Sequence, residues 1–176
     1  MEYYELIRKR CSVRKYLDKK VESSKLTQIL EAARVAPTGC NKQPFKLIVC
    51  DNAQSLEKIA QSGTIYNAPL TIIVCAETDK AWVRPYDKKN IAEIDASIVT
   101  TQMMLEAANQ GLGSVWICNF KPDIIRSGFN LPANLEPVNI LAIGYGDGEP
   151  ASISRFETQR KKISELVYYN LSLIHI

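Results

Sequence analysis

The longest regular segment of the sequence is residues 91–110, which reads IAEIDASIVTTQMMLEAANQ. Drawn as a helix, it carries apolar residues around most of its circumference, and Gly111 is well suited to end it. A helix with only one buried face would show a single apolar stripe. This one must therefore run through the centre of a domain or lie between two chains, and the other segments have to pack around it.

Short apolar runs, rich in β-branched residues, predict four strands at residues 45–50, 70–75, 114–117 and 138–143. The second run, LTIIVC, is apolar throughout, as expected for a strand that is buried on both faces. Helices are predicted at residues 2–9, 24–34 and 52–61, and in a short segment that begins at Pro122. Ser23 and Ser24 are candidates to cap the second of these helices. Strands and helices do not alternate regularly, so the order favours an α+β fold over a doubly wound sheet.

Residues 1–170 are expected to form a single domain, since no repeat or Pro/Gly-rich linker divides them. The last six residues, 171–176, read LSLIHI and are either a cloning scar or an arm that docks on a partner. The charged N-terminus has no apolar region typical of a signal peptide, and no stretch is long enough to span a bilayer. Five cysteines without a CxxC pair indicate free thiols in a reducing compartment, so we expect a cytoplasmic protein.

Several kinds of chemistry are disfavoured. The only histidine is in the last six residues, so a triad or a Cys–His nucleophile has no mid-chain imidazole, and a zinc site would need scattered thiolates. No GxxxxGK[ST] loop is present. The glycines at 111 and 113, and those of GYGDG at 144–148, lack the strand–glycines–helix order of a dinucleotide fingerprint. A net charge of +3 does not indicate nucleic acid or an anionic membrane as a partner.

Four polar features remain. In RKRCSVRKY, the residues Arg10, Ser12 and Arg14 alternate, and an extended backbone would place them on one side as a grip for a phosphate or for flavin carbonyls. The alternative is a solvated basic turn. APTGCNKQP at 36–44 is either a ligand-binding loop or a helix cap and turn. WICNF at 116–120 lies at a strand end, where ligands often bind, and its alternative is ordinary core and loop. QRKK at 159–162 is a late basic cluster, and its alternative is a basic surface without a ligand.

Taken in order, these segments resemble the FMN-dependent nitroreductase family of NAD(P)H:flavin-type oxidoreductases. The resemblance is carried by RCSVRKY, APTGCNKQPFKLIVC, the long run from AWVRPYDKKN to GLGSVWIC, LPANLEPVNILAIGYGDGEP and RKKISELV. It implies a central, mostly antiparallel sheet flanked by helices, in a homodimer with FMN at the interface. The long helix would form much of that interface, and the C-terminal segment would reach over the partner.

The resemblance also implies which residues bind FMN. The phosphate and the pyrimidine-side or ribityl oxygens would be held by Arg10, Ser12 and Arg14. The loop contributed by the other subunit would be Pro37, Thr38, Gly39, Asn41 and Gln43. Backbone near flavin N5 would come from Ile117, Cys118 and Asn119. Late basic residues that neutralise the phosphate would be Arg160 and Lys161. A lysine common in the family two residues before this arginine is replaced here by Thr158.

The implied activity is electron transfer from NADH or NADPH through flavin N5 to nitroaromatic, quinone or similar conjugated acceptors, by a ping-pong mechanism. The protein would supply position rather than an acid or base, so no residue is assigned a catalytic role. Aromatic residues at 81–86 and Phe120 are candidates to line the acceptor slot. Three alternatives remain open at this point: a flavin-binding redox sensor or store without turnover, a flavoenzyme for dehalogenation or flavin breakdown, and a small anion- or nucleic-acid-binding module.

Overall fold

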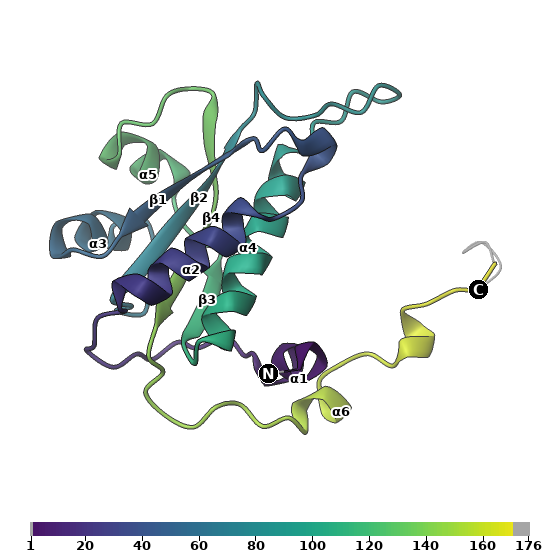
Figure 1. Ribbon diagram of the computed structural model, residues 1–176. Coiled ribbons are helices and arrows are strands. Elements are labelled where there is room, and N and C mark those ends of the chain that lie inside the picture. The colour runs from purple at the N-terminus through teal and green to yellow at the C-terminus, as the bar shows by residue number, and fades with distance from the viewer. Residues whose placement is uncertain (1, 171–176) are drawn as a thin grey trace.

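Four antiparallel strands form the centre of the molecule in the order β1–β2–β4–β3. The computed structural model describes residues 2–170, so the predicted tail at 171–176 lies outside the described residues. The strands are β1 (Phe45–Cys50), β2 (Leu70–Glu77), β3 (Gly113–Ile117) and β4 (Leu135–Gly144). Figure 1 shows the strands side by side, with helices on both faces. The α+β prediction and the antiparallel sheet are confirmed.

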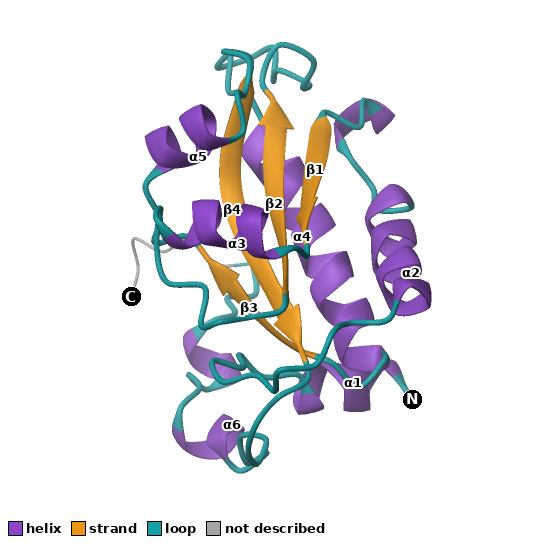
Figure 2. Ribbon diagram, turned by 90° about the vertical axis from the view of Figure 1, so that its left-hand side faces the viewer, coloured by secondary structure: helices purple, strands orange, loops and turns teal. Residues whose placement is uncertain are grey.

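Helices α2 (Ser23–Arg34) and α4 (Ala92–Asn109) cover one face of the sheet, and α3 (Ala53–Ala60) and α5 (Pro122–Gly128) cover the other. Figure 2 shows α3 and α5 in front of the strands and α4 behind them. Successive side chains of β2 point to opposite faces of the sheet. Ile72 and Val74 pack toward α4, whereas Ile73 and Cys75 pack toward α3 and α5. This explains why the predicted strand at 70–75 has apolar residues on both of its faces.

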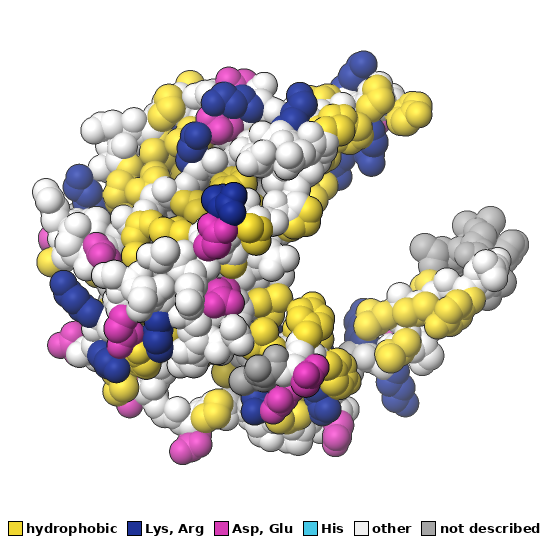
Figure 3. Space-filling model, in the orientation of Figure 1, with side chains coloured by type: hydrophobic (Ala, Val, Ile, Leu, Met, Phe, Trp, Pro, Cys, Tyr) yellow, Lys and Arg dark blue, Asp and Glu magenta, His cyan; other side chains and the backbone are white. Residues whose placement is uncertain are grey.

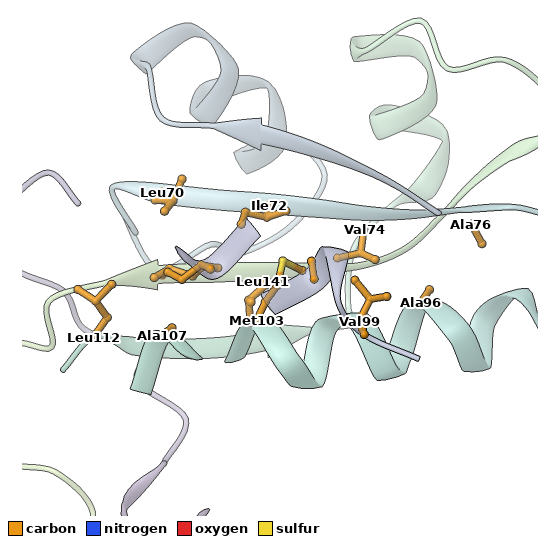
Figure 4. Close-up of a cluster of buried hydrophobic side chains, with 14 of the residues drawn as sticks. Leu70, Ile72, Val74, Ala76, Ala96, Val99, Met103, Ala107, Leu112 and Leu141 are labelled. Carbon is orange, nitrogen blue, oxygen red and sulfur yellow. The ribbon is translucent and has the colours of Figure 1, made fainter. Parts of the chain in front are cut away.

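The long helix α4 lies across the sheet and is the largest element of the fold. Ala96, Val99, Met103 and Ala107 form its buried stripe and meet β2 and β4 (Figure 4). Small residues in this stripe let the helix backbone come close to the strands. Outside the stripe, Ile94 keeps 47% of its surface exposed. The apolar character of the helix therefore exceeds what its own sheet covers.

Two local predictions were wrong. Ser23 and Ser24 are the first residues of α2, not its cap; Glu22 occupies the N-cap position and makes no side-chain capping bond. Strand β4 begins three residues before the predicted start, because the sheet accepts Pro137 at an irregularity. The register of β2 against β4 shifts between Val74, opposite Asn139, and Cys75, opposite Pro137. A bulge is one of the few places in a sheet that tolerate a proline.

The remaining elements are α1 (Tyr3–Lys9), a 3₁₀ turn at Gly39–Asn41, α6 (Arg155–Thr158) and a second 3₁₀ turn at Ile163–Glu165. Beyond α6 the chain stands away from the body, with apolar side chains along it (Figures 1 and 3). Ile163 is 73% exposed there. Within residues 2–170, no helix has the length and apolarity needed to cross a membrane.

Candidate functional site

The segment that contains Arg10, Ser12 and Arg14 runs along the outer edge of β3. Ser12 pairs with Ser114 in a parallel bridge, and the Val13 amide donates to the Ser114 carbonyl at 2.9 Å. The contact is close because Gly113 has no side chain: a Cβ there would lie 2.6 Å from a Val13 methyl. The segment is thus held extended, as the alternating pattern predicts.

A cavity of about 750 Å³ opens against this segment. Arg10, Ser12 and Arg14 all line it, but so do Cys11 and Val13, so both sides of the segment border the space. Its other walls are the end of α1, the last turn of α4, residues 111–114, and the loop at residues 146–151 together with Ile153. The cavity is the place where ends of three distant parts of the chain meet.

The sequence did not single out the four glycines of these walls as ligand-binding residues. Gly111, Gly113, Gly146 and Gly148 line the cavity, and Gly111 and Gly148 have positive φ angles of 75° and 125°. Bare backbone here leaves room for a ligand and exposes peptide groups to it. The three glycines of GYGDG could have indicated a ligand-binding loop. They do so only when the loop is known to lie opposite the basic segment.

Hydrogen bonds fix the loop at 146–151 to the basic segment. The Asp147 amide donates to the Lys15 carbonyl at 2.9 Å, and the Leu17 amide donates to the Tyr145 carbonyl at 2.8 Å. The Tyr16 hydroxyl donates to the Val13 carbonyl at 2.8 Å, and burial raises the pKa of this phenol well above its ordinary value. The two walls are therefore joined by main-chain hydrogen bonds.

Positive charge gathers at the α1 end of the cavity. Arg10 is half-buried, and its Nη1 lies 3.9 Å from the Met104 sulfur. Burial lowers the pKa of the Arg10 guanidinium, and the nearby charges of Arg155 and Arg160 lower it further. Arg155, four residues before the late basic segment, also donates to the Arg10 carbonyl at 3.0 Å. None of the ion pairs formed among residues 2–170 involves Arg10, Arg14, Arg155 or Arg160. Lys161 is exposed on the same stretch.

The loop that holds Pro37, Thr38, Gly39, Asn41 and Gln43 lies at the opposite end of α4. The Gly39 amide donates to Oδ1 of Asp95 in the first turn of that helix, at 2.9 Å. Asp95 is thirteen residues before Ala108, which lines the cavity, so the two points are about 20 Å apart along the helix. None of the five loop residues lines the cavity. One chain does not bring this loop and the basic segment together.

The loop itself is held in an unusual backbone conformation. Cys40, Asn41 and Gln43 have φ angles of 51°, 54° and 50°, a region that costs free energy for residues other than glycine. Internal bonds maintain it: the Gln43 amide donates to Oγ1 of Thr38 at 3.0 Å, and Gln43 Nε2 donates to the Asn41 carbonyl at 3.1 Å. Side chains at the tip are therefore prearranged, and Asn41 and Gln43 are exposed. This is more order than a simple turn requires.

The third predicted group, Ile117, Cys118 and Asn119, follows the end of β3. Ile117 is buried in the core beneath α3 and α5, whereas Cys118 and Asn119 are exposed. The Trp116 indole nitrogen lies 3.2 Å from the Cys118 sulfur. In the part of the chain that the structure describes, β3 is an edge strand whose outer side is paired only at Ser12. Its peptide edge beyond Ser114 has no strand partner among residues 2–170, and the cavity lining includes β3 only as far as Ser114.

The two candidates for an acceptor slot are not side by side. Phe120 packs in the core beneath α3 and α5, where a Cβ at Gly63 would come within 3.3 Å of its Cβ. The loop at 81–86 lies instead beside Gly39, since a Cβ there would lie 3.3 Å from Trp82 Cβ. Tyr86, at the tip of that loop, is 94% exposed. Within one chain these rings do not face a common space.

Comparison with known proteins places this geometry in context. Residues 7–63 and 60–145 match the family described as the Nitroreductase family. A crystal structure of a nitroreductase family protein from Clostridium difficile 630 is 50% identical and superposes with a TM-score of 0.96, covering 98% of this chain and all of that one. An FMN-dependent nitroreductase from Clostridium difficile R20291 is 29% identical, with a TM-score of 0.75 and coverage of 95% and 98%.

A relative from Methanothermobacter thermautotrophicus is named, provisionally, an NADH dehydrogenase/NAD(P)H nitroreductase. It is 30% identical over 173 residues, which cover 91% of this chain and 85% of the relative. An FMN reductase [NAD(P)H] from Bacillus subtilis is 26% identical over 153 residues, covering 76% of this chain and 61% of that protein.

Proposed function

Because the chain belongs to the nitroreductase family, we propose that it is an FMN-dependent oxidoreductase that carries electrons from NADH or NADPH to nitroaromatic, quinone or similar conjugated acceptors. The observation that carries the proposal is the group of arginines around Arg10, which lines the cavity. Arg10 lies near Arg155 and Arg160, and no carboxylate among residues 2–170 forms an ion pair with them. Several like charges brought together in this way are suited to a dianionic phosphate.

The residues present fit the phosphate end of FMN. Arg10 and Arg160 would bind the phosphate, and the Ser12 hydroxyl can donate to a phosphate oxygen. Arg14, further along the same extended segment, would meet the pyrimidine-side or ribityl oxygens. The unpaired edge of β3 offers peptide groups to the ring system. When bound, FMN supplies the redox chemistry, taking a hydride from the nicotinamide and passing electrons to the acceptor in a ping-pong sequence.

The position of the loop at 37–43 supports a site shared between two copies of the chain. Its prearranged polar side chains lie about 20 Å along α4 from the cavity, so a site that uses both needs a second copy. Two further observations support a homodimer: Ile94 is exposed on α4, and the C-terminal segment carries exposed apolar residues, including Ile163 and Leu166. In such a dimer, each cavity would receive the loop of the other copy.

The visible spectrum of the purified protein, followed by addition of NADH or NADPH without oxygen, tests the proposal. Flavin absorption bands that are lost on addition of the nicotinamide and return with a quinone support it. Bands that neither NADH nor NADPH removes would point instead to a flavin-binding sensor or store. A protein without flavin bands, even after incubation with FMN, would contradict the proposal as a whole.

A further inference from the structure

Arg155 was not among the residues that the sequence singled out, yet its guanidinium makes four hydrogen bonds to main-chain carbonyls. Nη1 donates to Ala151 and Ser152, both at 2.7 Å. Nη2 donates to Arg8 at 2.9 Å and to Arg10 at 3.0 Å. The last two carbonyls lie at the C-terminal end of α1, where a cation is favoured by the helix dipole. Arg155 therefore joins the start of the basic segment to the end of the loop that precedes α6.

Phe156 connects Arg155 with Arg160. The Arg155 Cζ atom lies 4.3 Å from the centre of the phenyl ring, and the Arg160 Cζ atom lies 5.8 Å from it. Guanidinium groups stack favourably on aromatic faces at such distances. Residues 157–162 are exposed, so the half-buried ring of Phe156 limits where the Arg160 side chain can lie.

These contacts link three guanidinium groups, those of Arg10, Arg155 and Arg160, and Arg10 lines one end of the cavity. Their charges repel one another, and the lowered pKa of Arg10 follows from burial together with the other two charges. The repulsion among the three guanidinium groups is offset when an anion binds between or beside them. Of the three, Arg155 has its Nη1 and Nη2 atoms occupied by carbonyls, so it acts on an anion through its charge and through the placement of Arg10.

We propose that Arg155 and Phe156 are positioning residues for the phosphate of the flavin: Arg155 fixes Arg10 and adds a third positive charge, and Phe156 holds Arg160 in place. This inference rests on the proposed function. It predicts that the pair selects a flavin that carries a phosphomonoester over one that does not. Riboflavin, which shares the ring and ribityl chain of FMN but lacks the phosphate, is therefore the discriminating probe.

The test is titration of flavin-free protein with FMN and with riboflavin, followed by quenching of flavin fluorescence. Arg155→Gln keeps a hydrogen-bond donor but removes the charge, and Phe156→Leu keeps an apolar contact but removes the ring face. We expect the Kd for FMN to rise about tenfold for Arg155→Gln and about threefold for Phe156→Leu, with the Kd for riboflavin within about twofold of wild type. Phe156→Tyr should restore FMN affinity. Arg34→Gln is the matched control, since Arg34 is exposed on α2 and pairs with Glu31.

Parallel weakening of both flavins would overturn the inference, because it would show that the two residues only support the fold. Unchanged FMN affinity in both variants would overturn it as well. If Arg155→Gln does not fold, as judged by circular dichroism, the Phe156→Leu and Phe156→Tyr pair decides. Failure of the proposed function would look different: the wild-type protein itself would bind neither FMN nor riboflavin. If the wild type binds FMN and both variants bind it equally well, only the inference about Arg155 and Phe156 fails.

Discussion

The amide of Gly39 donates a hydrogen bond to the carboxylate of Asp95 at 2.9 Å, and Asp95 is only 1% exposed. The bond joins the loop at 37–43 to the first turn of α4, the end of a helix at which a negative charge is favoured. The second carboxylate oxygen, Oδ2, is buried and has no hydrogen-bond partner among the described residues. The conformation of an exposed loop thus depends on one buried acid.

Replacement of Asp95 tests this dependence. Asp95→Ala should lower the free energy of unfolding by about 1–3 kcal/mol, because the Gly39 amide loses its acceptor in a buried place. Asp95→Asn keeps an acceptor oxygen and should lose less. Urea unfolding measures both variants. If Asn is as damaging as Ala, the charge of Asp95 matters more than its hydrogen bond.

Replacement of Gly113 tests the packing of the basic segment on β3. In Gly113→Ala the new methyl would lie 2.6–3.0 Å from three side-chain atoms of Val13, a stiff β-branched residue. We expect a loss of about 1–3 kcal/mol in the free energy of unfolding and weaker flavin binding, since the segment has to move away from the strand. Gly128→Ala is the control, because the new methyl would lie 4.0 Å from Lys58 Cβ, an ordinary van der Waals distance. Equal behaviour of the two variants in urea would argue against close contact at Gly113.

The buried thiol of Cys75 predicts a pH dependence of stability. Burial raises the pKa of Cys75 from 9.0 to about 12. The unfolded chain then releases this proton at a lower pH than the folded protein does. The contribution of the thiol is complete below about pH 9 and is lost as the pH rises toward 12, at up to about 1.4 kcal/mol per pH unit.

Urea unfolding of wild type and Cys75→Ala between about pH 8 and pH 11 measures this effect, because that range spans the ordinary pKa of a thiol. The variant should show a shallower loss of stability above pH 9. Cys40→Ala is the control, since that thiol is exposed. Identical slopes for wild type and Cys75→Ala would show that another group governs the alkaline limb.

Replacement of Ile94 tests the shared site. Ile94→Lys places a charge on the part of α4 that its own sheet leaves uncovered, so it should weaken or abolish the proposed dimer. Sedimentation velocity gives the oligomeric state of the variant. Gln54→Lys, at an exposed position of α3, is the control. A wild-type monomer that binds FMN would contradict the shared site directly.

Much of the fold could be predicted because its signals are local. The apolar run in β2 and the long helix ended by Gly111 follow from periodicity and from the conformational freedom of glycine. The start of β4 was missed because Pro137 ordinarily argues against a strand, and only the pairing with β2 shows how it is accepted. Local pattern therefore gave the type of each element more securely than its ends.

The candidate site was less accessible to prediction because its contacts join distant parts of the chain. The bond from Arg155 to the Arg10 carbonyl spans 145 residues, and nothing in the letters around Arg155 indicates it. The same holds for the loop at 146–151, whose role in the cavity depends on its bonds to residues 15–17. Sequence order alone also could not show that the two predicted halves of the site lie at opposite ends of one helix.

That last arrangement limits how the chain can vary. One helix carries the anchor of the loop at one end and a wall of the cavity at the other, so adding a single residue within α4 would rotate one end against the other by about 100° and displace it by about 1.5 Å. In a two-fold pair the error would appear in both sites at once. We expect substitutions on the outer surface of α4 to be tolerated far more readily than any change in its length.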